Sequence, residues 1–121
     1  MKSTSMVVVL LCTLGLFFAI DCMAAAQDGG PRRIEVVSNR FAFLPGEITL
    51  KKGQPVVLVL KSDDVAHGLR FRELNVDVKV GKGGTAEVSF TPQMTGDFIG
   101  HCSVFCGSGH GAMILKLHVV N

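Results

Sequence analysis

The sequence predicts an all-β domain, a Greek-key sandwich or barrel of about seven or eight antiparallel strands. Short segments rich in β-branched and aromatic residues follow one another from Ile34 to the C-terminus, about ten residues apart. Clusters of glycine, proline or aspartate separate these segments and are typical of turns. No helical periodicity of apolar residues occurs after residue 33, so helices are not expected to form part of the core.

Most of the strands are identified by alternation of apolar and polar residues, because successive side chains of a strand point to opposite faces. Val56–Leu60 differs, since its continuous apolar run predicts a strand buried on both faces. The chain has no Trp and no Tyr, so phenylalanines must supply the aromatic core. The strands expected are 34–37, 41–43, 48–50, 56–60, 76–80, 86–90, 97–101 and 114–120, with Phe41, Phe43, Phe71, Phe90 and Phe98 in the core.

Residues 1–26 have the features of a secretory signal peptide. Lys2 precedes the apolar run Met6–Ile20, and alanines 24–26 provide small residues for cleavage. The run is shorter than the roughly 20 residues that span a bilayer as a helix, so cleavage is expected, with an uncleaved membrane anchor as the alternative. A polar linker, 27–33, then leads to the domain at 34–121. We therefore expect an exported protein, periplasmic or otherwise extracytoplasmic.

The net charge and the number of cysteines limit the classes of function that this protein can have. The net charge is +2, and removal of residues 1–26 takes away Lys2 and Asp21, one charge of each sign. This balance argues against a nucleic-acid partner. Cys102 and Cys106 are the only cysteines after residue 26. In an oxidising compartment such a pair forms a disulfide unless a metal holds both sulfurs.

The most informative motif places Cys102, Cys106, His110 and Met113 at spacings of four, four and three residues. His67 lies 35 residues before Cys102. Thiolate and imidazole ligands favour copper, zinc or iron, and a thioether points most toward copper. These residue types predict a copper site.

The sequence pattern also places the five residues together. The loop 102–113 connects the last two predicted strands at one end of the sandwich. His67 follows strand 56–61 across a short turn, so with aligned sheets it reaches the same end. Asp63 and Asp64 lie in that turn, where they either orient His67 through a hydrogen bond or serve as ordinary turn residues. His101 is expected to point away from Cys102, by strand alternation.

Three other sites compete with this interpretation. A Cys102–Cys106 disulfide explains the thiols alone. A structural zinc site of two cysteines, His67 and His110 has no need of Met113, and the usual zinc-finger spacing is absent. A mononuclear blue-copper site uses one cysteine, two histidines and a methionine, which leaves one thiol over.

The segments 100–113 and 64–67 resemble the dinuclear copper (CuA) ligands of cytochrome c oxidase subunit II and of the nitrous oxide reductase copper domain. The resemblance extends over about 34–120 and implies a cupredoxin fold. It also implies that Cys102 and Cys106 bridge two copper ions, that His67 and Met113 complete one copper, and that His110 and the Val104 carbonyl complete the other.

The resemblance implies a function as an extracytoplasmic one-electron carrier, which is not an enzyme by itself. Electrons would pass at His110 to or from a redox protein such as a cytochrome c or a terminal oxidase or reductase. Val104 stands where the oxidase members carry a glutamate that holds magnesium, so no magnesium site is expected. No membrane span is expected after signal cleavage. The alternatives are a periplasmic copper chaperone and a mononuclear copper cupredoxin.

Overall fold

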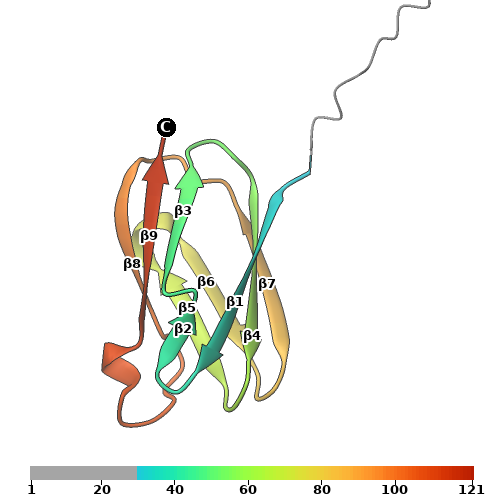
Figure 1. Ribbon diagram of the computed structural model, residues 1–121, viewed down its shortest axis with the longest axis vertical. Coiled ribbons are helices and arrows are strands. Elements are labelled where there is room, and N and C mark those ends of the chain that lie inside the picture. Colours follow the sequence, from blue (N-terminus) through green and yellow to red (C-terminus); the bar gives the residue numbers. More distant parts are fainter. Residues whose placement is uncertain (1–29) are drawn as a thin grey trace, which may run out of the picture.

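The computed structural model describes residues 30–121, which form two packed β-sheets (Figure 1). The predicted signal peptide 1–26 and the first three linker residues lie outside the described residues. One sheet has the order β2-β1-β4-β7 and the other the order β3-β9-β8-β5-β6. The strands are β1 (Arg32–Asn39), β2 (Ala42–Leu44), β3 (Glu47–Lys51), β4 (Val56–Ser62), β5 (His67–Phe71), β6 (Val76–Val80), β7 (Thr85–Phe90), β8 (Gly96–His101) and β9 (Ile114–Val120).

The predicted all-β sandwich is confirmed, but two of its details were wrong. The expected count of seven or eight strands missed β5, because its sequence His-Gly-Leu-Arg-Phe lacks a run of β-branched residues. The sheets are also mixed rather than antiparallel, since β1 pairs in parallel with β4 and β3 in parallel with β9. The chain changes sheet at Pro45, which places β3 beside the last strand.

The first strand begins at Arg32, two residues before the predicted boundary. Arg32 lies opposite Val56 on β4, and its N–H donates a hydrogen bond to the Pro55 carbonyl at 2.9 Å. Arg72 follows β5 directly and begins a short 3-10 turn at Arg72–Leu74. In residues 30–121 no helix has the length and apolarity required to cross a membrane.

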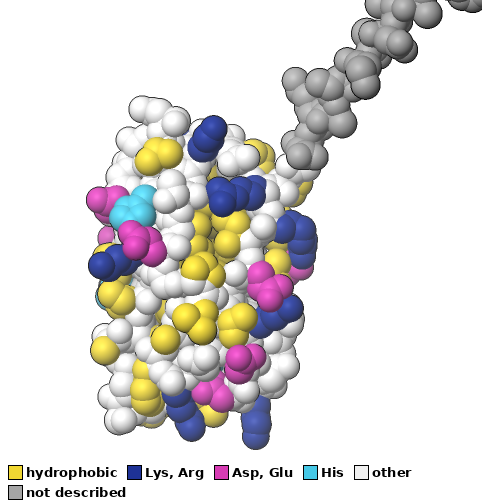
Figure 2. All heavy atoms as spheres, viewed as in Figure 1, with side chains coloured by type: hydrophobic (Ala, Val, Ile, Leu, Met, Phe, Trp, Pro, Cys, Tyr) yellow, Lys and Arg dark blue, Asp and Glu magenta, His cyan; other side chains and the backbone are white. Residues whose placement is uncertain are grey.

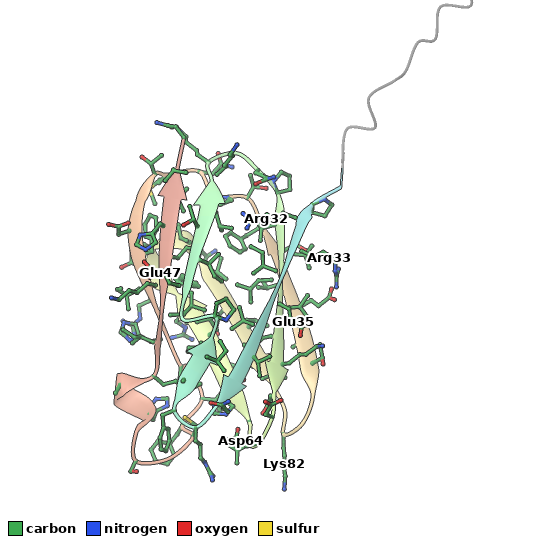
Figure 3. The ribbon with its side chains drawn as sticks, viewed as in Figure 1. Arg32, Arg33, Glu35, Glu47, Asp64 and Lys82 are labelled. Atoms are coloured by element: carbon green, nitrogen blue, oxygen red, sulfur yellow. The ribbon has the colours of Figure 1, made fainter. Side chains whose placement is uncertain are left out.

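Strand β4 is buried on both faces, as its apolar run predicts. Its inner face packs in the core, while two ion pairs lie over its outer face. Arg33 on β1 pairs with Glu87 on β7, and Glu35 pairs with Lys61 at 2.9 Å. Arg33 and Glu35 point outward from β1 (Figure 3). The aliphatic stems of these long side chains cover Val57 and Val59, so no third layer of secondary structure is needed to keep the two valines from solvent.

The core is aliphatic with few aromatic rings. Phe43 and Phe71 are fully buried, whereas Phe90 and Phe98 are only partly buried. Phe41 is 37% exposed, so its predicted place in the core is wrong. The Phe41 ring instead lies against Gly107 and Gly109, in the loop before β9.

On the surface, His118 on β9 lies between two carboxylates from the neighbouring strands. Its Nδ1 contacts Asp97 at 2.5 Å and its Nε2 contacts Glu47, which Figure 3 labels on β3. Hydrogen bonds that the His118 ring donates to Asp97 and then to Glu47 raise its pKa above the ordinary 6.5. Figure 2 shows the outer surface of this side of the sandwich, where a histidine side chain lies between acidic ones. His118 is therefore a surface residue held by two carboxylates.

We expect His118 to make the stability of the metal-free protein pH-dependent. Because the folded pKa is raised, the stabilising contribution is complete below pH 6.5 and is lost as the pH rises through the folded value. Urea unfolding midpoints at pH values from about 6 to 9 should fall more steeply for the wild type than for His118→Gln. Parallel pH profiles of the two proteins would contradict this role.

Candidate metal centre

The loop 102–113 leaves β8 and returns to β9 at one end of the sandwich (Figure 1). His101 and Ile114 are paired in the β8–β9 ladder, and the Cys102 N–H donates to the Met113 carbonyl at 3.1 Å. The two ends of the loop are therefore held together by the sheet. Within the loop, the His110 N–H donates to the Gly107 carbonyl at 3.2 Å, at the start of a short 3-10 turn.

The structure brings all five predicted side-chain ligands together in one cluster. The sulfurs of Cys102 and Cys106 are 3.7 Å apart. Nδ1 of His67 is 3.9 Å from the Cys102 sulfur, and Nδ1 of His110 is 3.7 Å from the Cys106 sulfur. The Met113 sulfur lies 3.8 Å from that of Cys106. Residues from β5 and from the loop thus converge at one point.

The backbone carbonyl of Val104 also points at the cluster. It accepts a hydrogen bond from the Cys102 thiol at 3.2 Å. The Val104 carbonyl is the sixth ligand that the resemblance in sequence implies. Of the five side-chain ligands only His110 is exposed in part, while His67 and Met113 are fully buried.

The chemistry of this donor set fits copper. Both cysteines are free, and a separation of 3.7 Å is far beyond the disulfide bond length of about 2.05 Å. Met113 is part of the cluster, and zinc sites rarely use a thioether. Cys102, Cys106 and His67 offer ligand atoms within 4.8 Å of one another. Soft sulfur and imidazole donors at this spacing form a copper-binding site.

Burial of the thiols favours a bound cation. Burial raises the pKa of the Cys106 thiol to about 11, with the adjacent Cys102 thiol contributing in the same direction. The positive charge of Arg40 acts in the opposite direction. A buried thiolate is costly unless a cation offsets its charge, and a soft metal ion provides that charge.

Asp64 fixes the orientation of His67. Because a carboxylate can only accept, Nε2–H of His67 donates to Oδ1 of Asp64, at 2.6 Å. The unprotonated Nδ1 of His67 then faces the sulfurs, as a metal ligand must. Asp63 makes no such contact, and its backbone N–H donates to the Ser38 carbonyl at 3.0 Å. Of the two predicted aspartates, the structure therefore supports an orienting role for Asp64 alone.

The hydrogen bonds that Asp64 accepts lower the pKa of its carboxyl group. Burial alone would raise the pKa of Asp64, but hydrogen bonds from the Arg40 backbone, His67 and the Val65 backbone outweigh it and lower the value to about 2. Asp64 is therefore ionised at neutral pH and able to hold the His67 proton.

Replacement of Asp64 by asparagine should weaken copper binding by about 10–100-fold, the usual effect of losing a partner that orients a metal-binding histidine. Asparagine has one acceptor oxygen, whereas both oxygens of the Asp64 carboxylate accept hydrogen bonds. Competition with a chromophoric copper chelator measures the change. Asp63→Asn is the matched control and should bind like the wild type. Equal affinities of the two variants would contradict the orienting role.

The start of the loop is packed tightly against β5. The Ser103 N–H donates to the Gly68 carbonyl at 3.3 Å, and a Cβ on Gly68 would lie 2.1 Å from Oγ of Ser103. The Ser103 hydroxyl donates to Asp77 at 3.0 Å. Arg70 donates twice to Asp77, and this contact is the main reason that the Asp77 pKa is lowered. Strands β5 and β6 thus anchor the loop beside His67.

A cavity of about 610 Å³ opens beside the cluster. Cys102 and His110 line it together with His101, whose side chain is exposed and lies outside the cluster. Phe105, between the two cysteines, is 79% exposed, and its ring centroid is 5.5 Å from that of His110. Phe105 belongs to none of the ligand positions predicted from the sequence. Met94 is exposed and is not among the residues that line this cavity.

Comparison with known proteins gives one family match and several relatives. A model of the "cupredoxin-like domain" family matches residues 9–115. Cytochrome c oxidase subunit 2 of Thermus thermophilus is 30% identical over 102 residues, covering 79% of this chain and 76% of that protein. Nitrous-oxide reductase of Cupriavidus necator is 32% identical over 97 residues, covering 77% of this chain but only 15% of the reductase.

Solved structures agree with this result. A chain in the cryo-EM structure of a heme-copper terminal oxidase dimer superposes with a TM-score of 0.67 and 27% identity, over 77% of this chain and 67% of that one. The match with the Thermus protein extends over most of both chains, whereas the reductase is matched over a small part of its length. For the reductase the similarity is therefore limited to a small part of the protein.

Proposed function

We propose that this chain, which belongs to the cupredoxin-like domain family, is an extracytoplasmic one-electron carrier with a dinuclear CuA centre. The observation that carries the proposal is the pair of unbonded sulfurs 3.7 Å apart, each with its own histidine Nδ1 within 3.9 Å. A mononuclear blue-copper site, which uses one cysteine, would leave one of these buried thiols without a metal. Two copper ions bridged by Cys102 and Cys106 would use every donor of the cluster.

In this proposal the sulfurs of Cys102 and Cys106 would hold both ions. His67 and Met113 would complete the ligands of one ion, and His110 and the carbonyl of Val104 would complete those of the other. The bound pair of ions would supply reversible one-electron chemistry. The protein holds its ligands on β5 and on a loop tied to β8 and β9, which limits their movement between oxidation states.

The proposed partner is a redox protein such as a cytochrome c or a terminal oxidase or reductase. His110 is the ligand closest to solvent, and the exposed ring of Phe105 lies beside it. Residues 1–26 would direct export, which agrees with an electron-transfer role outside the cytoplasm. The subunit 2 relatives support this reading by similarity of the domain.

Metal counting combined with EPR spectroscopy tests the proposal. Copper-loaded protein should contain two copper ions per chain and show a hyperfine pattern from one electron shared equally by two copper nuclei. A pattern from a single copper nucleus, or one copper per chain, would favour the mononuclear alternative. Rapidly exchangeable copper without reversible electron transfer would favour the copper chaperone.

A further inference from the structure

Arg40, in the turn between β1 and β2, contacts both of the segments that supply ligands. Its backbone N–H donates to Oδ2 of Asp64 at 2.8 Å, and the other oxygen of this carboxylate orients His67. Its side-chain Nε donates to the carbonyl of Cys106 at 3.0 Å. These contacts join residues 24 and 66 positions apart in the chain. One residue therefore connects the His67 segment with the ligand loop.

Phe41 extends this contact along the loop. A Cβ added to Gly107 would lie 2.9 Å from the Phe41 ring, and one added to Gly109 would lie 2.4 Å from it. The ring therefore packs directly on the loop backbone at these two glycines. Gly107 also has a φ of 137°, a conformation that residues with a side chain rarely adopt.

We propose that Arg40 and Phe41 form a clamp that holds the His67 segment and the ligand loop in their metal-binding arrangement before metal binds. Both are positioning residues, since neither contributes an atom to the cluster. The effect of the clamp on copper binding rests on the proposed function, whereas its effect on the order of the loop does not.

The loop needs such a clamp for an entropic reason. It contains three glycines, Gly107, Gly109 and Gly111, and glycine loses more conformational freedom on ordering than other residues. In residues 30–121 the Arg40 side chain makes no ion pair with a carboxylate, and its hydrogen bond is made to the loop, at the Cys106 carbonyl. A loop ordered in advance lowers the entropy cost of binding.

Amide hydrogen exchange in metal-free protein tests the clamp directly. In Arg40→Gln the amides of the loop 102–113 should exchange at least about tenfold faster, because local opening becomes easier. The amides of β4 should keep their wild-type rates. Arg33→Gln is the matched control, since it changes an exposed arginine near the start of β1 that pairs with Glu87 rather than with the loop, and it should leave the loop unchanged. Equal loop exchange in the two variants would overturn the proposal.

Phe41→Leu provides a second, independent variant. Leucine keeps an apolar side chain but cannot cover both glycines, so faster exchange is expected around Gly107 and Gly109. Arg40→Lys should restore part of the protection, because lysine keeps the charge and a donor without the planar Nε–H geometry. Unchanged exchange in Phe41→Leu would remove Phe41 from the clamp.

Copper affinity, measured by chelator competition, gives the second readout. Arg40→Gln should bind copper about 10–100-fold more weakly than the wild type, and Arg33→Gln should match the wild type. If wild-type protein does not bind copper, the proposed function fails, whereas the exchange experiment still decides on the clamp. If the wild type binds copper and Arg40→Gln binds it equally well, the clamp has no role in binding.

Discussion

Replacement of Cys106 by serine should abolish the dinuclear centre. The hydroxyl is a hard donor that stays protonated, so it cannot bridge two copper ions as a thiolate does. Copper content should fall from two ions per chain to one or none, and the EPR pattern of a shared electron should disappear. The affinity loss should exceed the roughly 100-fold that marks the loss of an outer partner.

The control for this variant is Ser108→Ala, in the same loop but with an exposed side chain. It should bind two copper ions with the wild-type spectrum. Thermal unfolding of metal-free Cys106→Ser will show whether the fold persists, since Cys106 is only 4% exposed. A Cys106→Ser protein that keeps two copper ions and the shared-electron spectrum would refute the bridging role.

Replacement of Gly100 by alanine should destabilise the fold without changing a ligand. A Cβ at this position would lie 2.6 Å from Cζ of Phe71 and 2.8 Å from Cδ1 of Leu69, and both neighbours are fully buried. Overpacking of this kind costs about 1–3 kcal/mol. Urea unfolding of the metal-free protein measures the loss.

A double variant shows whether the clash with the ring is the cause. Phe71→Leu removes the end of the ring and should itself destabilise the protein, by less than the roughly 3–5 kcal/mol of a change from Phe to Ala. In Gly100→Ala/Phe71→Leu the added methyl fills the vacated space, so the loss should be smaller than the sum by about 0.5–3 kcal/mol.

Gly81→Ala is the matched control for the glycine change. A Cβ on Gly81 would meet no atom within 4 Å, so its effect should stay within about 0.5 kcal/mol. Strict additivity in the double variant would show that Phe71 is not the residue that requires glycine at position 100. A Gly100→Ala protein as stable as Gly81→Ala would refute the close packing itself.

Much of the candidate site was predictable because most of its ligands are local in sequence. Cys102, Cys106, His110 and Met113 lie within one loop, and their residue types alone select soft metals. His67 was predictable because a buried strand and a short turn precede it. The structure brings these residues to one cluster, as the sequence analysis expected.

Other features depend on residues that are distant in sequence. The choice between Asp63 and Asp64 required knowing which carboxylate faces the His67 ring. Strand β5 was missed because its pairing with β6, not its composition, makes it a strand. The parallel pairing of β3 with β9 likewise depends on where the chain changes sheet.

By itself the sequence determined the class of fold and the chemistry of the ligands, since alternation and side-chain type are properties of neighbouring residues. Only the tertiary structure decided which residues hold those ligands in place. Arg40 and Phe41 carry no recognisable motif, and their contacts join a turn after β1 to a loop 66 residues later. Such contacts exist only after the two sheets have packed, because packing alone brings distant backbone atoms within hydrogen-bonding distance.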